Sequence, residues 1–501
     1  MKPSRSVRHC IVWLLVSLAV ISIAFGQSKG APIPSHPRGL KFQPLRFAPP
    51  TASAYRGVLG NGVVGFFVED HDLPLVTISV IIRVGTYLDP AGKEGLASAV
   101  GSQLRSGGTA RYPADAFDEE VDFLAAQISS GIGATSGRAS VNFMSKDTDR
   151  SLDLFFDMLR HPAFQQDRFD LYKSQQLQGM GRRNDRTEAI EAREWNRLMR
   201  GDKHFTSAYS TRSSVSSLTR EDLIEFHRRY YHPANFILAV SGDFKTAEIK
   251  AQLERLMAGW DSGSLAPKVP KPDFVPVPGV YLVNKPDVNQ ARVSMGHLGI
   301  MRGNPDEFVI DMMNEILGGS GFTSRIMGRV RTDEGLAYDA GSVFSAGIYF
   351  EGHFCASFQS KSMTAARAAQ IVLDEIARML REKVSREDLE TVKNQAIEVF
   401  PRFFASATAV ATTFASDEYT GRDPKFWETY RDKIRAVTVE DVQRVARQYL
   451  HADKLVILAV GNAEDILKGN PERPEDSFLK MGGGHITRIP LPDPLTMIYP
   501  K

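Results

Sequence analysis

Cysteine is scarce in this sequence. Its 501 residues include two cysteines, Cys10 and Cys355. Cys10 precedes an N-terminal apolar segment that has the features of a secretory signal, so Cys355 would keep no partner for an internal disulfide after cleavage. The position of Cys10 before that segment also argues against lipid attachment there. A disulfide-stapled fold is therefore excluded, and a chain of this size can fold on its hydrophobic core alone.

The sequence also has no large net charge of either sign. The chain has 61 Lys and Arg against 59 Asp and Glu, a formal charge of +2. Removal of residues 1–26 would take away Lys2, Arg5 and Arg8 and no acid, which leaves −1. A nearly neutral mature chain has no electrostatic footprint for nucleic acid, so we expect no nucleic-acid partner.

Long apolar runs are absent except near the N-terminus. Residues 1–9 are basic, residues 11–25 are apolar, and small residues stand at the end of this run at Ala24 and Gly26. This pattern predicts a secretory signal peptide over residues 1–26. The alternative is an uncleaved membrane anchor, but the run is shorter than the span of about twenty residues that a bilayer requires. No later stretch could cross a membrane, so we expect an exported chain without a membrane span after cleavage.

The composition is that of a globular protein, with 43% hydrophobic and 24% charged residues. The length predicts two to four domains. Clusters of Pro, Gly and Ser divide the chain, notably a stretch with five prolines that predicts a semi-rigid linker. The predicted segments are a signal peptide (1–26), an extended arm (27–50), a first half (51–261), a linker (262–279), a second half (280–469) and a tail without helix or strand (470–501).

The first half alternates short strands with amphipathic helices. Residues 58–68 predict a hairpin that turns at Asn61-Gly62. The β-branched run at 76–84 predicts a central strand, and residues 95–104 predict a close-packed helix after it. A further strand is expected within residues 128–143, and a clear amphipathic helix over 147–160.

One module occurs twice. Thr219, Asp222, Tyr230 and His232 match Thr438, Asp441, Tyr449 and His451, and Ile-Leu-Ala-Val follows in both places at a nearly constant offset. In each copy the threonine is placed as a helix N-cap, with the aspartate at the capping-box position. A second echo, Ser-Lys before a helix, occurs at 145 and 360. Matches in the same order indicate a duplicated unit.

The stretch from Gly95 to Thr109, Gly-Leu-Ala-Ser-Ala-Val-Gly-Ser-Gln-Leu-Arg-Ser-Gly-Gly-Thr, resembles the start of the pitrilysin/insulinase family of zinc peptidases. A Leu-Thr-x-x-Asp-Leu module at 218–223, continued to Gly242-Asp243, is also similar to that family. The resemblance covers about residues 50–465. It implies an α+β fold of two homologous halves, each a mixed β-sheet with helices packed on one face, arranged as a clamshell.

The resemblance also implies a zinc site whose ligands are missing here. The family's inverted motif His-x-x-Glu-His supplies two zinc ligands and a general base. In this sequence the two histidines correspond to Ser98 and Ser102, and the glutamate to Gly101. The third ligand, a glutamate on a later helix, would fall near Gln178 or Gly179. Serine is a poor zinc ligand and glycine abstracts no proton, so we expect no metal in this chain.

The second half keeps a different part of the family pattern. Residues 317–338 contain a Gly-rich loop, a Ser-Arg pair and an Arg-x6-Tyr pair. By resemblance, Arg331 and Tyr338 would hydrogen-bond the substrate backbone and stabilise the oxyanion that forms on it. The alternative is that both are helix-end residues holding the turn at Gly335. The predicted substrate-binding residues are Gly318, Gly319, Gly321, Arg331 and Tyr338.

These features predict an exported subunit that is inactive alone. A homologous partner would bear the intact zinc motif, and this chain would form half of the peptide-binding chamber and support the reaction through Arg331 and Tyr338. The competing hypothesis is a non-catalytic scaffold or peptide-binding protein of the cell envelope. A third hypothesis is an independent peptidase that uses another metal site. The resemblance is to the bacterial type of this family, which favours a periplasmic location for the exported chain.

Overall fold

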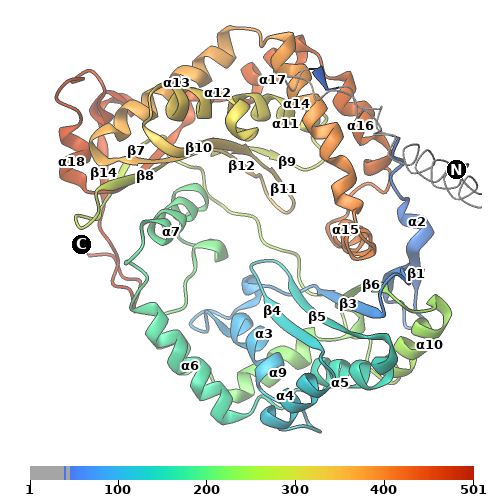
Figure 1. The fold of residues 1–501 in the computed structure, drawn as a ribbon. Coiled ribbons are helices and arrows are strands. Elements are labelled where there is room, and N and C mark those ends of the chain that lie inside the picture. Colours follow the sequence, from blue (N-terminus) through green and yellow to red (C-terminus); the bar gives the residue numbers. More distant parts are fainter. Residues whose placement is uncertain (1–38, 41–45, 501) are drawn as a thin grey trace, which may run out of the picture. The chain divides into compact units, whose positions relative to one another are not determined.

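The computed structural model describes residues 39–40 and 46–500, so the predicted signal peptide and most of the predicted extended arm lie outside the described residues. The chain divides into two units, Met1–Phe47 and Ala48–Lys501. All helices and strands below belong to the second unit, in which two six-stranded sheets carry the architecture (Figure 1). In the described part, no helix combines the length and the apolar character needed to cross a bilayer.

The first half supplies one mixed sheet, ordered β1-β2-β6-β3-β5-β4, in which β2 and β6 run parallel and the other pairs antiparallel. Its elements are α2 (Ala52–Tyr55), β1 (Arg56–Val58), β2 (Val64–Glu69), β3 (Leu75–Ile82), α3 (Leu96–Ser106), α4 (Ala114–Phe123), β4 (Gln127–Ile132), β5 (Gly137–Met144), α5 (Thr148–Arg160), α6 (Gln166–Met180), α7 (Thr187–Arg200), α8 (Arg212–Ser217), α9 (Arg220–Tyr230), β6 (Phe236–Gly242) and α10 (Thr246–Met257).

The second half repeats this arrangement. Its sheet is ordered β10-β12-β8-β13-β7-β14, in which β13–β7 and β14–β7 are parallel and the other pairs antiparallel. The short strands β9 and β11 form a separate parallel pair. Its elements are β7 (Gly279–Asn284), β8 (Gln290–Leu298), β9 (Ile300–Met301), α11 (Glu307–Asn314), η6 (Glu315–Gly319), α12 (Arg325–Met327), η8 (Gly328–Asp333), β10 (Ala337–Phe344), β11 (Ala346–Gly347), β12 (His353–Lys361), α13 (Ala365–Arg381), α14 (Arg386–Val399), α15 (Ala407–Thr420), α16 (Phe426–Ala436), α17 (Val439–Tyr449), β13 (Val456–Gly461), α18 (Ala463–Lys468) and β14 (Ile486–Ile489). The segments η6 and η8 are π-helical.

Five strands of the two sheets correspond in order, with β2, β3, β4, β5 and β6 matching β7, β8, β10, β12 and β13. The sixth strands differ, because β1 runs antiparallel to β2 whereas β14 runs parallel to β7. The predicted α+β fold of two homologous halves is therefore confirmed. The predicted hairpin forms from β1 and β2, and Gly62 at its turn has φ +86°. The predicted central strand is β3, which lies between β6 and β5. The single strand expected within 128–143 is a hairpin of two strands, β4 and β5.

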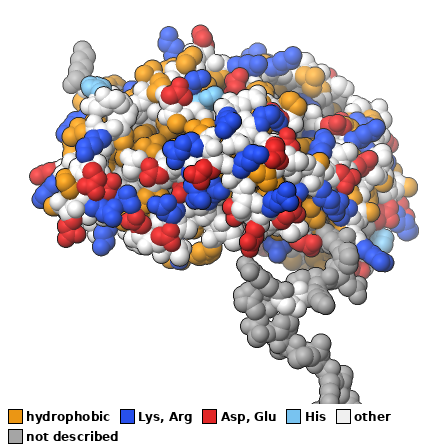
Figure 2. Space-filling view, turned by 90° about the horizontal axis from the view of Figure 1, so that it is seen from above, with side chains coloured by type: hydrophobic (Ala, Val, Ile, Leu, Met, Phe, Trp, Pro, Cys, Tyr) orange, Lys and Arg blue, Asp and Glu red, His pale blue; other side chains and the backbone are white. Residues whose placement is uncertain are grey.

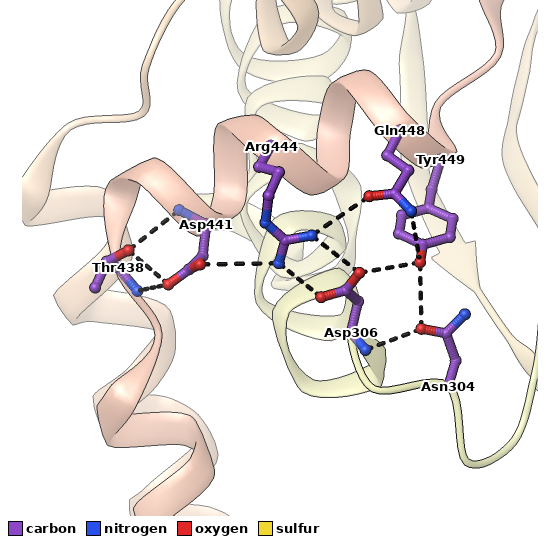
Figure 3. A network of polar contacts seen from close by, with 7 residues as sticks. All are labelled: Asn304, Asp306, Thr438, Asp441, Arg444, Gln448 and Tyr449. Atoms are coloured by element: carbon purple, nitrogen blue, oxygen red, sulfur yellow. Dashed lines mark hydrogen bonds and ion pairs between the residues drawn. The ribbon is translucent and has the colours of Figure 1, made fainter.

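The duplicated module has the same local chemistry in both halves. Thr219 and Thr438 cap α9 and α17, each in a reciprocal capping box with the predicted aspartate. In the second half Asp441 also pairs with Arg444, which forms a bidentate ion pair with Asp306 at 2.6 and 3.0 Å (Figure 3). In the first half Asp222 pairs instead with Lys93, at 2.8 Å, from the loop before α3. Each capping box thus ties its helix to the loop preceding α3 or α11.

One helix of each half packs on the sheet of the other half: α15 on the first sheet and α7 on the second. In the first sheet, Val76, Ile78, Val80 and Ile82 face the core that this half builds with its own helices. On the opposite face, Phe66 contacts Phe414 of α15, and Ser241 hydrogen-bonds Thr408 of α15 at 2.8 Å. Figure 1 shows α15 and α7 lying between the two sheets. The prediction of helices on one face is therefore wrong for both sheets, since a second layer comes from the other half.

The reciprocal helix is α7 of the first half. Ile190, Trp195 and Met199 on α7 form a buried cluster with Val456, Leu458 and Val460 on β13. Glu191, also on α7, accepts hydrogen bonds from Arg292 and Ser294 of β8 at 2.5 and 2.6 Å. The halves are consequently joined by apolar packing and by a partly buried ion pair.

The tail also departs from expectation. No helix or strand is predicted there, and the structure adds one: Ile486–Ile489 form β14, which pairs in parallel with β7 at the edge of the second sheet. The chain then returns to the first half, where Tyr499 donates a hydrogen bond to Glu194 of α7 at 2.9 Å. By contrast, all residues between Met257 and Gly279 are described and contain neither helix nor strand.

Candidate functional site

The helix that should carry zinc is α3, and its start is held by Asp89. Gly95, with φ +103°, precedes the first turn. The carboxylate of Asp89 accepts hydrogen bonds from the backbone N–H groups of Gly95 and Ala97 at 2.8 and 2.7 Å. Burial raises the pKa of Asp89 to about 6. The aspartate satisfies N–H groups that a helix start leaves unpaired.

The position of the catalytic glutamate on α3 is closed by β4. A Cβ added to Gly101 would lie 2.8 Å from the carbonyl carbon of Gly131 and closer still to the backbone nitrogen of Ile132. Ser130 of β4 also donates a hydrogen bond to the Gly101 carbonyl at 2.8 Å. Because backbone cannot yield as a flexible side chain can, only glycine fits here without movement of β4.

The remaining zinc-motif positions hold no metal ligand. Ser98 and Ser102 are half-buried on α3, whereas Gln178 and Gly179 are exposed on α6. Nothing lies within 4 Å of the place where a Gly179 Cβ would be. Across the described residues, no group of three or more His, Cys, Asp or Glu is arranged to hold a metal ion. The residues present do not fit the zinc of the family.

Arg331 and Tyr338 lie together at the other candidate position. Arg331 is in η8, and Gly335, with φ +64°, turns the chain towards β10, where Tyr338 stands. Nη1 of Arg331 donates a hydrogen bond to the carbonyl of Tyr338 at 2.7 Å. The guanidinium carbon lies 4.4 Å from the ring centre of Tyr338 and 4.6 Å from that of Phe322. Arg331 is therefore held between two aromatic rings.

These rings face solvent. Tyr338 is 82% exposed and Phe322 is 69% exposed. Within the described part of the chain, no hydrogen bond, ion pair or ring contact joins Arg331 or Tyr338 to α3. The structure thus brings Arg331 and Tyr338 together with each other, and it adds Phe322, which the sequence analysis did not single out.

The turn that carries Arg331 is anchored on α13. Arg329 forms an ion pair with the buried Glu375 at 3.0 Å, and Glu334 forms one with Arg367 at 2.5 Å. The two pairs flank Arg331 along the chain. They fix the π-helical segment η8, a kind of segment that occurs frequently at functional sites.

The Gly-rich loop is explained by close packing. A Cβ on Gly318 would lie 2.8 Å from the Cβ of Ser342 and closer still to its backbone nitrogen. The backbone of β10 therefore packs directly against η6, as the backbone of β4 packs against α3. A Cβ on Gly319 would lie 2.8 Å from Oε1 of Glu315. Gly321 has φ +58°, a conformation that favours glycine. Backbone packing accounts for these glycines, and their predicted contact with substrate stays a prediction.

A cavity of about 710 Å³ lies at the N-terminal end of α3. Its lining includes Tyr87, Glu94, Arg200, His204, Phe205 and Phe274. Arg200 stacks on Phe350 at 4.9 Å and has no carboxylate within ion-pair distance among the described residues. Aromatic walls with a few charged groups are typical of sites that hold peptides or small ligands.

A smaller cavity of about 380 Å³ adjoins the Gly-rich loop and includes Asp311, Glu315 and Gly319 in its lining. Although Asp311 is exposed, partial desolvation by the surrounding protein and the nearby Glu307 and Glu315 together raise its pKa to about 7. The sequence analysis missed both acids, because carboxylates spaced four residues apart on a helix ordinarily mark a solvated face.

On the face shown in Figure 2, Lys and Arg side chains are interspersed with Asp and Glu, and neither sign covers the surface continuously. Charge is therefore arranged locally on this face. The two cavities and the Arg331 turn are among the places where charged groups meet concave or aromatic surroundings.

Comparison with known proteins identifies the family. Residues 67–202 match the model described as insulinase (peptidase family M16), and residues 217–396 match the model described as peptidase M16 inactive domain. Together the two matches cover more than half of the chain.

The relatives carry different names. An uncharacterized zinc protease of Rickettsia bellii is 22% identical over 338 residues, which cover 66% of this chain and 80% of that protein. The non-peptidase homolog YmxG of Helicobacter pylori is 20% identical over 399 residues, which cover 79% and 91%. Sequence identity of 20–22% does not show whether this chain has peptidase activity. That question depends on the residues at the site.

The fold has solved counterparts. A crystal structure of a peptidase M16 inactive domain from Pseudomonas fluorescens matches with a TM-score of 0.74 at 23% identity, covering 81% of this chain and 97% of that chain. The two duplicated sheets agree with this match. The chain belongs to the M16 (insulinase) family of peptidases and includes its inactive-type domain.

Proposed function

We propose that this chain is the non-zinc subunit of an exported M16 metallopeptidase. A homologous partner with the intact His-x-x-Glu-His motif would carry the zinc, and this chain would form half of the peptide-binding chamber. The observation that carries the proposal is a contrast within one molecule. Gly101 is packed so tightly against β4 that the general base has no room, whereas Arg331 is partly exposed and lies between two aromatic rings.

The retained pair has the chemistry for a supporting role. Only Nη1 of Arg331 makes a hydrogen bond within the described part of the chain, so its other N–H groups remain for a peptide carbonyl. The rings of Phe322 and Tyr338 fix the guanidinium plane, which lowers the entropy cost of binding. Preorganised donors of this kind stabilise the negative charge that develops on a peptide carbonyl during hydrolysis.

The test is reconstitution. We expect the purified chain alone to hydrolyse no peptide, and a mixture with the zinc-bearing partner to show activity that a chelator abolishes. Such a partner is to be sought as a similar-length exported chain encoded in the neighbouring reading frame. Arg331→Ala and Tyr338→Phe should each lower turnover by roughly tenfold to a thousandfold, the range for single oxyanion donors.

A matched control is Arg228→Ala, which removes an exposed guanidinium paired with Glu225 on α9. This variant should keep full activity in the mixture. Hydrolysis by the isolated chain at the rate of the mixture would refute the division of roles.

The second candidate function is a non-catalytic scaffold or peptide-binding protein of the cell envelope. The name of the Helicobacter pylori relative, a non-peptidase homolog, favours it. In that case Arg331→Ala and Tyr338→Phe would leave any associated peptidase activity unchanged.

Export, with a periplasmic location, is part of the proposal and rests on the signal-like residues 1–26. Cell fractionation of the full-length chain tests it directly. A chain of unprocessed mass in the cytoplasmic fraction would contradict export, and an unprocessed chain in the membrane fraction would indicate a retained anchor.

A further inference from the structure

The C-terminal residues 490–500, named here the strap, lead from the second half to the first. They follow β14, which pairs in parallel with residues 280–283 of β7. Ile489 is buried in the cluster that joins α7 to β13, and Leu491 packs against the same cluster. Figure 1 shows the red end of the chain beside the connection between α6 and α7. The strap is thus fixed to the second sheet at one end and continues along the first half.

Backbone carbonyls of the strap bind the first half. Nδ2 of Asn184, between α6 and α7, donates a hydrogen bond to the carbonyl of Pro492 at 2.8 Å. The backbone N–H of Arg212, at the start of α8, donates one to the carbonyl of Leu495 at 2.7 Å. Both bonds use the main chain of the strap, so substitution of a strap side chain leaves these acceptors in place.

Tyr499 ends the strap on α7. Its hydroxyl donates a hydrogen bond to the buried Glu194 at 2.9 Å, and the guanidinium carbon of Arg197 lies 4.1 Å from its ring centre. Burial and the nearby Glu194 raise the pKa of Tyr499 to about 12, so the hydroxyl keeps its proton at neutral pH. A hydrogen bond to a carboxylate is stronger than one between neutral groups, and a guanidinium over the ring adds to it.

The turn before Tyr499 is shaped locally. Oδ1 of Asp493 accepts hydrogen bonds from the backbone N–H groups of Leu495 and Thr496 at 3.0 and 2.8 Å. Met497 has φ +56°, a conformation that residues other than glycine adopt rarely. Such a conformation persists where the surrounding contacts hold it. The turn therefore places Tyr499 on α7 rather than leaving it free at the chain end.

The helix that Tyr499 binds buries charge. Glu191, Arg193 and Glu194 of α7 are all buried. Burying ions costs desolvation free energy, which their pairing offsets only in part. The helix α7 therefore docks on the second sheet less firmly than a helix with a wholly apolar face would. An additional tie between the halves consequently affects its position.

We propose that the strap is a clasp: it holds α7 on the second sheet, and its release lets α7 leave that sheet and the halves move apart. The joint for this movement is the connection between α6 and α7, in which residues 181–186 form no helix or strand. In the proposed function this chain forms half of the chamber, so release would widen the access of a peptide. That consequence rests on the proposed function, whereas the clasp can be tested without peptide, partner or zinc.

Cys355 reports on the release of α7. It lies on β12 and packs against the cluster of α7 and β13, and Glu191 of α7 acts on its thiol. Burial raises the pKa of this thiol to about 12, so the reactive thiolate is rare while α7 is docked. When α7 leaves the sheet, the thiol becomes accessible and its pKa returns towards the ordinary value.

The experiment measures how fast a maleimide at pH 8 labels Cys355 in the native full chain, with the label located by mass spectrometry. Tyr499→Phe, which removes one hydroxyl, should speed labelling roughly threefold to tenfold, the effect of one hydrogen bond on an opening equilibrium. A chain that ends at Pro490 keeps β14 but loses every hydrogen bond of the strap. It should be labelled about thirtyfold faster or more, since α7 then opens more often.

Tyr449→Phe is the matched control. The Tyr449 hydroxyl likewise donates a hydrogen bond to a carboxylate, that of Asp306 in the second half, at 3.0 Å (Figure 3). This variant should leave the labelling of Cys355 unchanged. Deuterium exchange at β3, in the centre of the first sheet, should stay unchanged in both tyrosine variants, because release of α7 does not unfold that sheet.

Labelling of Cys355 that is as slow in Tyr499→Phe and in the shortened chain as in the unaltered chain would overturn the inference. Equal acceleration by Tyr449→Phe, or faster exchange at β3 in Tyr499→Phe, would indicate a general loss of stability and would overturn it as well. Tyr499→Phe keeps the full length, so it remains decisive if the shortened chain does not fold. A chain with the clasp that supports no peptidase with any partner would contradict the proposed function alone.

Discussion

Gly101 on α3 and Ile132 on β4 are in backbone contact so close that no side chain can stand between them. The contact recurs in the second half, where Gly318 of η6 meets Ser342 of β10. In both halves an edge strand packs on a helical segment: β4 on α3, which precedes Gly107-Gly108, and β10 on η6, which contains Gly318-Gly319. The close packing of β4 on α3 therefore leaves no room for a glutamate side chain at position 101.

The first prediction concerns stability. Gly101→Ala should destabilise the protein by about 1–3 kcal/mol, because the added methyl group displaces the backbone of β4. The change is unfavourable even though alanine is the better helix former by about 1 kcal/mol. Chemical denaturation measures the difference in the free energy of unfolding.

Gly179→Ala provides the matched control. Gly179 is an exposed residue of α6, and nothing lies within 4 Å of its Cβ position. This substitution should be neutral or should stabilise the protein by up to about 1 kcal/mol. If both substitutions had the same effect, the close approach of β4 to α3 would be contradicted.

The second prediction concerns metal. The purified chain, dialysed against zinc and then against metal-free buffer, should retain well below one zinc per chain. A chelator should leave its melting temperature unchanged, because a structural zinc contributes directly to folding free energy and none is expected here. Stoichiometric zinc would instead support the independent peptidase, with a metal site other than Ser98, Gly101 and Ser102.

The third prediction concerns the helix exchanged between the halves. Glu191 is 10% exposed and its partner Arg292 is 28% exposed. Arg292→Met should cost about 2–4 kcal/mol of unfolding free energy, towards the lower part of the range for broken buried pairs because Arg292 is partly solvated. Urea denaturation of the full chain measures it.

The control for this prediction is Arg228→Met, which breaks an exposed ion pair and should cost about 0–1 kcal/mol. The double variant Glu191→Met/Arg292→Met should recover part of the loss, since no uncompensated charge then remains buried. A cost at Arg292 no larger than at Arg228 would show that the ion pair does not hold α7 on the second sheet.

Much of the fold could be predicted because its signals are local. The capping boxes at Thr219 and Thr438, the turn at Gly62 and the β-branched run of β3 are each fixed by neighbouring residues. The duplicated module could be recognised for the same reason, and it led to the correct pair of homologous halves.

The exchange of α7 and α15 could not be predicted in this way. The apolar face of a helix shows that the helix is buried but does not show against which sheet it packs. The strand β14 was missed because it is four residues long, follows a Gly-rich stretch and owes its structure to pairing with β7. Phe322 and Asp311 carry no sequence signal, since only the folded chain brings Phe322 to Arg331 and Asp311 to the wall of a cavity.

The last prediction is the pH dependence of stability at the start of α3. Burial raises the pKa of Asp89 from its ordinary value of 3.8 to about 6 in the folded chain. The folded state therefore binds this proton more tightly than the unfolded state, so the contribution of Asp89 to the free energy of unfolding should fall by about 1–3 kcal/mol as the pH rises from 4 to 6 and then level off. Asp89→Asn removes the titrating group, so the difference in unfolding free energy between the unaltered chain and this variant should follow the same fall. Urea denaturation at pH 4, 5, 6 and 7 measures it. A difference that is constant over this interval would show that Asp89 does not titrate there.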